Sequence, residues 1–183
     1  MKAIFLDRDG VINKYPGDTK YVTSPKEFKF LPGVKKAICL LSRFKYSIFI
    51  ISNQAGVAKG IYSQQTLDSI NNRMFKEFKK VNARIAGVYY CTHHSDANCS
   101  CRKPRIGLVK SAVKGKDINL KKTFFVGDTM RDIHTAKAAG CKSILVLSGK
   151  EKLSNSRNWD AKPDYVFKDL FEAVRFIREF NTK

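Results

Sequence analysis

The sequence predicts an α/β fold with a three-layer, Rossmann-like arrangement, in which helices cover both faces of one parallel sheet. Short apolar runs recur along the chain, helical apolar patterns separate them, and polar or glycine-containing segments follow most of the runs. Strands that alternate with helices in this way require right-handed crossovers and a parallel sheet.

The length of the chain favours a single domain over residues 1–183. A chain of 183 residues with 43% hydrophobic content can bury one core but is short for two. Only about 20 polar residues follow the first apolar run, which leaves no room for a large cap domain. We therefore expect an open site.

The elements follow from the periodicity of the apolar residues. Strands are expected at residues 2–6, 46–51, 85–90, 123–126, 143–147 and 165–167. Helices are expected from Pro32 to about residue 45, after the N-cap Ser63, and at residues 107–113, 129–139 and 170–180, with Gly140 ending the fourth of these. The helix after Ser63 should bury one face, formed by Leu67, Ile70, Met74, Phe75, Phe78 and Val81.

The net charge of +19 is compatible with binding to nucleic acid, anionic surfaces or phosphorylated metabolites, and does not choose among them. A solvated basic surface is the simplest interpretation. No apolar run approaches the roughly 18 residues of a membrane span, and the N-terminus carries no signal-peptide pattern. We expect a cytoplasmic monomer without a membrane partner, for which nucleic acid is a disfavoured ligand.

Polar side chains follow four of the predicted strands. They are Asp7 and Asp9, Ser52 and Asn53, Lys103 a few residues after its strand, and Asp128 and Asp132. The carboxyl ends of parallel strands meet at one edge of a sheet, which is where ligands bind. Paired acids at such an edge can hold a divalent cation and support phosphoryl chemistry.

Three of the five cysteines lie close together. Cys91, Cys99 and Cys101 share a short segment, residues 91–101, with His93. Four thiol and imidazole ligands leave no open coordination position, so the spacing predicts a structural zinc loop. His94 should face solvent or substrate. Cys39 and Cys141 are expected to be small core residues.

The motifs together resemble those of the haloacid dehalogenase-like phosphatases. The resemblance rests on Asp7-Arg8-Asp9-Gly10-Val11, Ser52, Lys103 and Gly127-Asp128-x-x-x-Asp132, in this order, and covers nearly the whole chain. It implies that Asp7 is the nucleophile, that Asp9 is the general acid and base, and that Ser52 and Lys103 stabilise the phosphoryl group. It further implies a Mg²⁺ bound by Asp7, Asp9 and Asp128, with Asp132 in support.

The zinc loop followed by Arg102-Lys103-Pro104 is similar to a narrower branch, the D,D-heptose 1,7-bisphosphate and histidinol-phosphate phosphatases. The segments at residues 52–60, 89–94 and 102–108 look closer to the heptose enzymes. This resemblance implies hydrolysis of the 7-phosphate of D-glycero-D-manno-heptose 1,7-bisphosphate, in the synthesis of nucleotide-activated heptose. Arg102, Asn53, Gln54 and Asp18 would bind the substrate.

Three alternatives remain open at this point. One is a histidinol-phosphate phosphatase, whose branch shares the short gap between His93 and Cys99. Another is a polynucleotide 3′-phosphatase, which the positive charge favours, although aromatic residues are not interleaved with the basic clusters. The third is an inactive anion-binding protein, which would be expected to have lost Asp7, Asp9 or Lys103.

Overall fold

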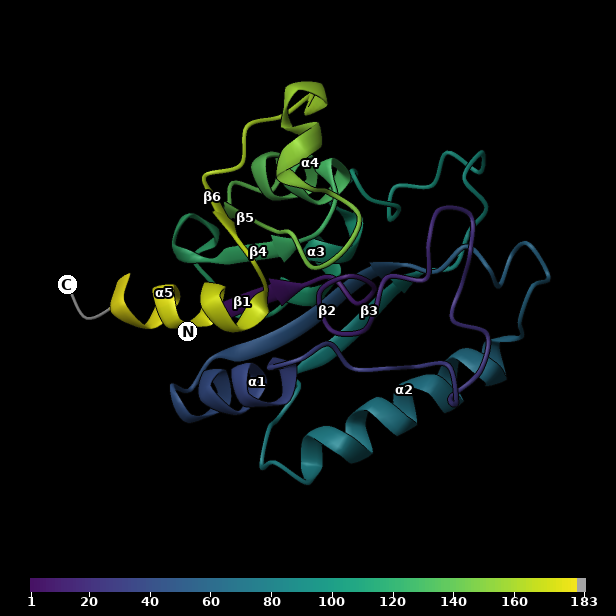
Figure 1. Ribbon diagram of the computed structural model, residues 1–183, viewed down its shortest axis with the longest axis horizontal. Coiled ribbons are helices and arrows are strands. Elements are labelled where there is room, and N and C mark those ends of the chain that lie inside the picture. The colour runs from purple at the N-terminus through teal and green to yellow at the C-terminus, as the bar shows by residue number, and fades with distance from the viewer. Residues whose placement is uncertain (181–183) are drawn as a thin grey trace.

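The computed structural model describes residues 1–180 and contains a six-stranded parallel sheet with the strand order β3-β2-β1-β4-β5-β6 (Figure 1). The strands are β1 Ala3–Leu6, β2 Ser47–Asn53, β3 Gly87–Cys91, β4 Phe124–Gly127, β5 Lys142–Val146 and β6 Tyr165–Phe167. The helices are α1 Val34–Arg43, α2 Gln64–Lys79, α3 Gly107–Val113, α4 Met130–Ala138 and α5 Leu170–Phe180, with 3₁₀ turns at Leu120–Lys122 and Leu153–Asn158. The predicted parallel α/β architecture is confirmed.

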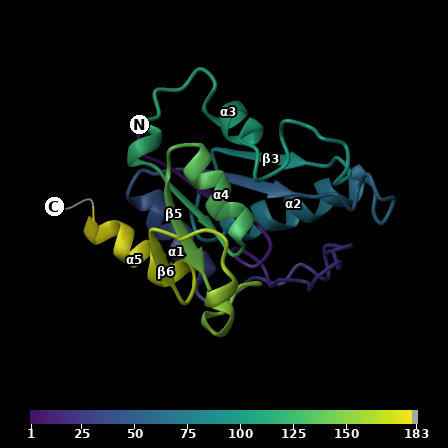
Figure 2. The ribbon, with the colours of Figure 1, turned by 90° about the horizontal axis from the view of Figure 1, so that it is seen from above.

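Helices cover both faces of the sheet because successive residues of each central strand point to opposite sides. In β1, Ile4 and Leu6 pack into a core shared with α1, α2 and α5, whereas Ala3 and Phe5 pack into a second core shared with α3 and α4. Figure 2 shows α3 and α4 together on the same side of the strands. All four residues of β1 are buried, so this strand lies at the centre of the molecule.

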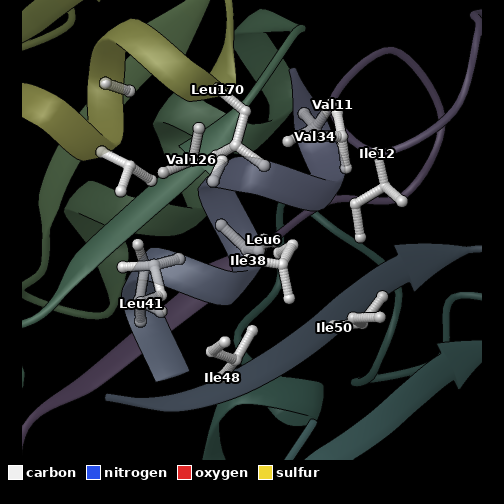
Figure 3. Close-up of a cluster of buried hydrophobic side chains, with 14 of the residues drawn as sticks. Leu6, Val11, Ile12, Val34, Ile38, Leu41, Ile48, Ile50, Val126 and Leu170 are labelled. Atoms are coloured by element: carbon white, nitrogen blue, oxygen red, sulfur yellow. The ribbon is translucent and has the colours of Figure 1, made fainter. Parts of the chain in front are cut away.

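The first core illustrates how the apolar spacing of α1 is used. Its buried residues are Val34, Ala37, Ile38 and Leu41, which recur at helical spacing on one face. Figure 3 shows Ile38 and Leu41 directed toward the strand residues Leu6 and Ile48. This packing of α1 holds β1 and β2 in place beneath the carboxyl edge of the sheet, where the polar residues lie.

The register of the sheet aligns the strand ends. Leu6 pairs with Ile50 of β2 and with Val126 of β4. Asp7, Ser52 and Asp128 follow these paired residues by one or two positions, so they emerge at the same edge of the sheet. The sequence-based prediction that these segments converge is therefore confirmed.

Several local predictions need correction. Phe75 is 37% exposed, because it follows the fully buried Met74 by a single residue and lies about 100° further round the helix. Cys39 is only half-buried, whereas Cys141 is buried as expected.

The cap predicted for α2 is present, since the Ser63 hydroxyl accepts a hydrogen bond from the Thr66 N–H. Within the described part of the chain, no helix is both long and apolar enough to cross a bilayer.

Candidate active site

A buried lysine joins two of the acids at the carboxyl edge of the sheet. The Lys103 ammonium lies 3.0 Å from Asp7 Oδ1 and 2.5 Å from Asp132 Oδ1. Burial disfavours the charge on Lys103, but the carboxylates of Asp132 and Asp7 outweigh it and raise the pKa of the lysine. Lys103 therefore stays protonated and can present a fixed positive charge beside Asp7.

Three carboxylates form a cluster around this point. Asp7, Asp128 and Asp132 each offer an oxygen, and these oxygens lie within 4.8 Å of one another. Burial raises the pKa of Asp7 to about 6, even though Lys103 acts in the opposite direction. Burial and the neighbouring Asp7 also raise the pKa of Asp128 well above its usual value. A buried set of carboxylate oxygens with too little positive charge around it fits Mg²⁺, which prefers such ligands.

The backbone around Asp128 leaves little free space. A Cβ on Gly10 would lie 2.1 Å from Asp128 Oδ2, and one on Gly149 would lie 1.9 Å from the same atom. Gly10 also has a φ of +82°, which side-chain-bearing residues rarely adopt. The Lys150 N–H donates to Asp128 Oδ2 over 2.8 Å. The loops after β1 and β5 thus hold this carboxylate in one orientation.

The side chain of Asp9 lies outside the cluster of three carboxylates, and its predicted place among the Mg²⁺ ligands stays a prediction. Arg8 Nη2 lies 3.1 and 3.0 Å from its two oxygens. Asn13 Nδ2 donates to Oδ1 over 2.8 Å, and Gln54 Nε2 donates to Oδ2 over 3.0 Å. Both oxygens therefore already accept hydrogen bonds, and Asp132 occupies the third position of the cluster instead.

The residues after β2 have different surroundings from those predicted. Asn53 lines the cleft, but its side-chain amide also clamps the backbone of Lys103, donating to the carbonyl over 3.2 Å and accepting from the N–H over 3.0 Å. Gln54 was predicted to bind substrate. It is 1% exposed, and its amide is held by Asp9 and by the Tyr62 hydroxyl, so it supports Asp9 from behind. Ser52 is buried at the base of the cleft.

A cleft of about 530 Å³ opens above Asp7. Asp18, Asn53 and Arg102, which were predicted to bind substrate, line it. Arg102 Nη1 is buried without a hydrogen-bond partner among the described residues, so one donor of this side chain is unsatisfied. The Asp18 carboxylate accepts from Tyr15 and pairs with Lys150 at 2.6 Å, which ties the loop after β1 to the loop after β5.

Three basic residues of the cleft, and one residue behind it, were not singled out from the sequence. Arg131 and His134 line it from α4, and Lys150 lines it from the loop after β5. Arg8, which is fully buried, lies behind the cleft and holds Asp9. The position of Arg8 between two acids was the only sequence signal for its role.

The predicted zinc ligands lie together. Cys99 Sγ lies 3.5 Å from Cys91 Sγ and 3.4 Å from Cys101 Sγ, and His93 Nδ1 lies 3.1 Å from Cys101 Sγ. Three sulfurs and one imidazole nitrogen at these separations fit a tetrahedral zinc ion. His94 turns away and pairs with Asp96 at the surface. The cluster ends at Cys101, directly before Arg102 and Lys103.

The fold and the cluster of acids and lysine define the class of protein: a haloacid dehalogenase-like hydrolase. The family model for HAD-hydrolase-like proteins matches residues 100–173. A crystal structure of the D,D-heptose 1,7-bisphosphate phosphatase from Bordetella bronchiseptica, complexed with magnesium and phosphate, superposes with a TM-score of 0.89 at 32% identity, covering 98% of this chain and 99% of that one.

Curated relatives narrow the class to a family. The D-glycero-β-D-manno-heptose-1,7-bisphosphate 7-phosphatase of Neisseria meningitidis serogroup B is 32% identical over 184 residues, covering 100% of this chain and 97% of the relative. The Campylobacter jejuni relative, named for the α anomer, is 32% identical over 180 residues, covering 97% and 96%. The chain belongs to the heptose 1,7-bisphosphate 7-phosphatase family and is a phosphatase.

Proposed function

We propose that this protein removes the 7-phosphate of D-glycero-D-manno-heptose 1,7-bisphosphate. The observation that carries the proposal is the similarity, over nearly the full length of both partners, to relatives named for this reaction. The juxtaposition of Asp7 with Lys103 at the base of a cleft that Arg102, Arg131 and Lys150 also line supports it.

The first chemical step would be attack by a carboxylate oxygen of Asp7 on the phosphorus atom of the substrate. The bond from phosphorus to the sugar oxygen breaks, and Asp9 supplies the proton that this leaving oxygen needs. Lys103 offsets the negative charge of the transferred group and keeps it close to Asp7. An aspartyl-phosphate and a free sugar hydroxyl result.

The second step would return the enzyme to its starting state. Water attacks the phosphorus of the aspartyl-phosphate, Asp9 removes its proton, and the bond to the Asp7 oxygen breaks to release inorganic phosphate. Because Asp9 already accepts hydrogen bonds from Arg8, Asn13 and Gln54, each proton transfer exchanges at least one of these bonds. Arg8 and Gln54 would thus orient Asp9 between the two steps.

Two metal ions fit the residues present. Asp7, Asp128 and Asp132 would hold Mg²⁺, which when bound neutralises charge on the phosphate and the acids. Cys91, His93, Cys99 and Cys101 would hold a structural Zn²⁺. The zinc loop would then fix the backbone that leads into Arg102 and Lys103.

The second phosphate of the substrate requires cations away from Asp7. Arg102 has an unused buried donor, and Lys150 and Arg131 line the same cleft. Arginine can bind a phosphate through two parallel hydrogen bonds. Since relatives are named for both anomers, the anomer that this protein prefers is left to experiment.

A substrate panel tests the proposal. It contains both anomers of heptose 1,7-bisphosphate, histidinol phosphate and a nicked duplex with a 3′-phosphate, each with Mg²⁺ and with the Asp7→Asn variant as the blank. We expect one heptose anomer to give the highest kcat/KM, with ³¹P NMR showing loss of the 7-phosphate alone. Faster hydrolysis of histidinol phosphate or of the duplex would overturn the substrate assignment and leave the phosphatase chemistry intact.

A further inference from the structure

The end of the sheet opposite the active site carries a dense group of cations. We call this surface the basal rim and define it as Lys2 and residues 43–45, 79–84 and 114–122. These segments precede β1, β2, β3 and β4, which are neighbours in the sheet. In Figure 1 they gather at the end marked N, from which the strand arrows point away.

Hydrogen bonds show that the segments are adjacent. The Arg84 N–H donates to the Ser42 hydroxyl over 3.0 Å, which joins the loop after α2 to the end of α1. The Ser47 N–H donates to the Lys2 carbonyl over 2.9 Å. The N-terminal ammonium donates to the Asp117 carbonyl over 2.9 Å, which adds the loop before β4. The basal rim is therefore one continuous surface.

The charge of this surface is almost entirely of one sign. Its ten exposed lysines and arginines are Lys2, Arg43, Lys45, Lys79, Lys80, Arg84, Lys114, Lys116, Lys121 and Lys122. Its only carboxylate is the exposed Asp117. The rim thus carries a net charge of about +9, close to half of the +19 of the whole chain. Among the described residues, Lys80 is the only one of the ten in an ion pair, with Glu77.

Helix stabilisation accounts for few of these cations. Basic residues in the last turn of a helix interact favourably with its dipole, and this applies to Arg43 of α1 and Lys79 of α2. The cations at positions 114–122, however, lie beyond the end of α3. Clustering unpaired like charges in loops destabilises the isolated chain through repulsion, so an anionic partner would relieve it.

We propose that the basal rim binds the surface of an anionic lipid bilayer. Eight of the ten cations are lysines, whose compact charges suit diffuse attraction to a charged surface, whereas arginine predominates in bidentate recognition of single phosphates. Phe44, 37% exposed, is an aromatic side chain among the cations that can enter the interface. This inference departs from the sequence-based expectation of no membrane partner.

The geometry of the sheet gives the bound protein a defined orientation. The catalytic cleft lies beyond the carboxyl ends of the strands and the basal rim lies at their amino ends, so a docked molecule keeps its cleft open to solution. A nucleic acid held on the rim would, in contrast, lie across the sheet from Asp7 and could not present a terminal phosphate to it. The charge therefore does not support a polynucleotide substrate.

Co-sedimentation with lipid vesicles tests the proposal on the full chain. Vesicles contain either phosphatidylcholine alone or about one-third phosphatidylglycerol, at about 0.1 M NaCl and again at about 0.5 M. The basal variant carries Lys79→Gln, Arg84→Gln, Lys114→Gln and Lys121→Gln. The control variant loses the same charge elsewhere, through Lys26→Gln, Lys29→Gln, Lys36→Gln and Lys168→Gln, all at exposed positions outside the rim.

We expect the wild type and the control variant to bind the anionic vesicles at low salt, and to lose binding at high salt. Each rim cation contributes about fivefold in partitioning, so the basal variant should bind a few hundredfold more weakly. Thermal melting verifies that both variants are folded.

Equal binding to neutral and anionic vesicles, or an equal loss in both variants, would overturn the proposal. So would tighter binding to a duplex oligonucleotide that the basal variant loses, which would assign the rim to nucleic acid. None of these outcomes depends on the identity of the phosphatase substrate.

Discussion

Replacing Asp7 by asparagine should abolish turnover and, in Mg²⁺-free buffer, make the protein more stable. In the proposed mechanism the carboxylate is the nucleophile, but it is buried beside Asp128 and Asp132, and among the described residues Lys103 is its one cationic partner. An amide has nearly the same shape. Its oxygen can still accept the hydrogen bond that the Arg8 N–H now donates to Asp7 Oδ1.

The size of the effect follows from the pKa of Asp7, which burial raises from 3.8 to about 6. The folded state then binds the proton more tightly than the unfolded state, so ionisation of Asp7 destabilises the fold. The cost begins above pH 3.8, is complete above about pH 6, and amounts to roughly 3 kcal/mol at pH 8. About half of this cost remains near pH 5. The Asp7→Asn variant, which cannot ionise, should recover most of the cost present at each pH.

Urea unfolding at pH 8 and pH 5 provides the assay, without a chelator, so that the zinc proposed for the Cys/His cluster is not removed. Asp68→Asn is the control, because Asp68 is exposed on α2 and accepts only from Gln64. The expected pattern is a gain for Asp7→Asn that is larger at pH 8, with little change in the control. The reasoning is refuted if the variant is no more stable than the wild type at pH 8, or if it turns over substrate.

Three further changes test other parts of the site. Lys103→Met leaves two buried carboxylates unpaired, so unfolding should become easier by about 3–5 kcal/mol and kcat should fall about 100-fold or more; a normal kcat would exclude its phosphoryl contact. Protein purified without chelator should contain one zinc per chain by mass spectrometry, and Cys99→Ser should lose it with a lower melting temperature; no zinc in the wild type would contradict the cluster's role. Gly10→Ala should displace Asp128 and weaken Mg²⁺ activation at least about tenfold. The control is Gly60→Ala, which has the same sign of φ and no atom within 4 Å, and which should cost only about 1 kcal/mol of stability. Equal Mg²⁺ activation constants in the two variants would contradict this prediction.

Much of the fold was predictable because its signals are local. The apolar runs mark strands that are buried on both faces, and the structure places the last helix, Leu170–Phe180, and the short helix Gly107–Val113 at their predicted positions. The convergence of Asp7, Ser52 and Asp128 followed from parallel topology alone, since every parallel strand delivers its next residue to the same edge. The proximity of the four predicted zinc ligands also followed from their spacing within one loop.

The surroundings of individual side chains were not predictable in this way. Gln54 and Asn53 are adjacent amides after the same strand, yet Gln54 is buried against Asp9 whereas Asn53 reaches the backbone of Lys103. Which one faces the cleft depends on the position of Tyr62, eight residues after Gln54, and on the loop after β3, which is distant in sequence. The same applies to Asp9. Its hydrogen bonds with Arg8 and Asn13 depend on how the backbone turns at Gly10, and the sequence pattern alone does not specify that turn.

The parallel sheet also separates the reaction from the charge of the protein. The cleft end carries the buried acids Asp7, Asp128 and Asp132, whereas the basal rim, at the amino ends of β1 to β4, carries exposed cations with a single carboxylate. A net charge of +19 therefore says little about the field at the reacting phosphate, which Lys103 and the proposed Mg²⁺ would set at short range. Salt should screen the exposed basal rim and leave the buried Lys103–Asp7 pair largely unaffected, so vesicle binding should fall at ionic strengths at which kcat is unchanged.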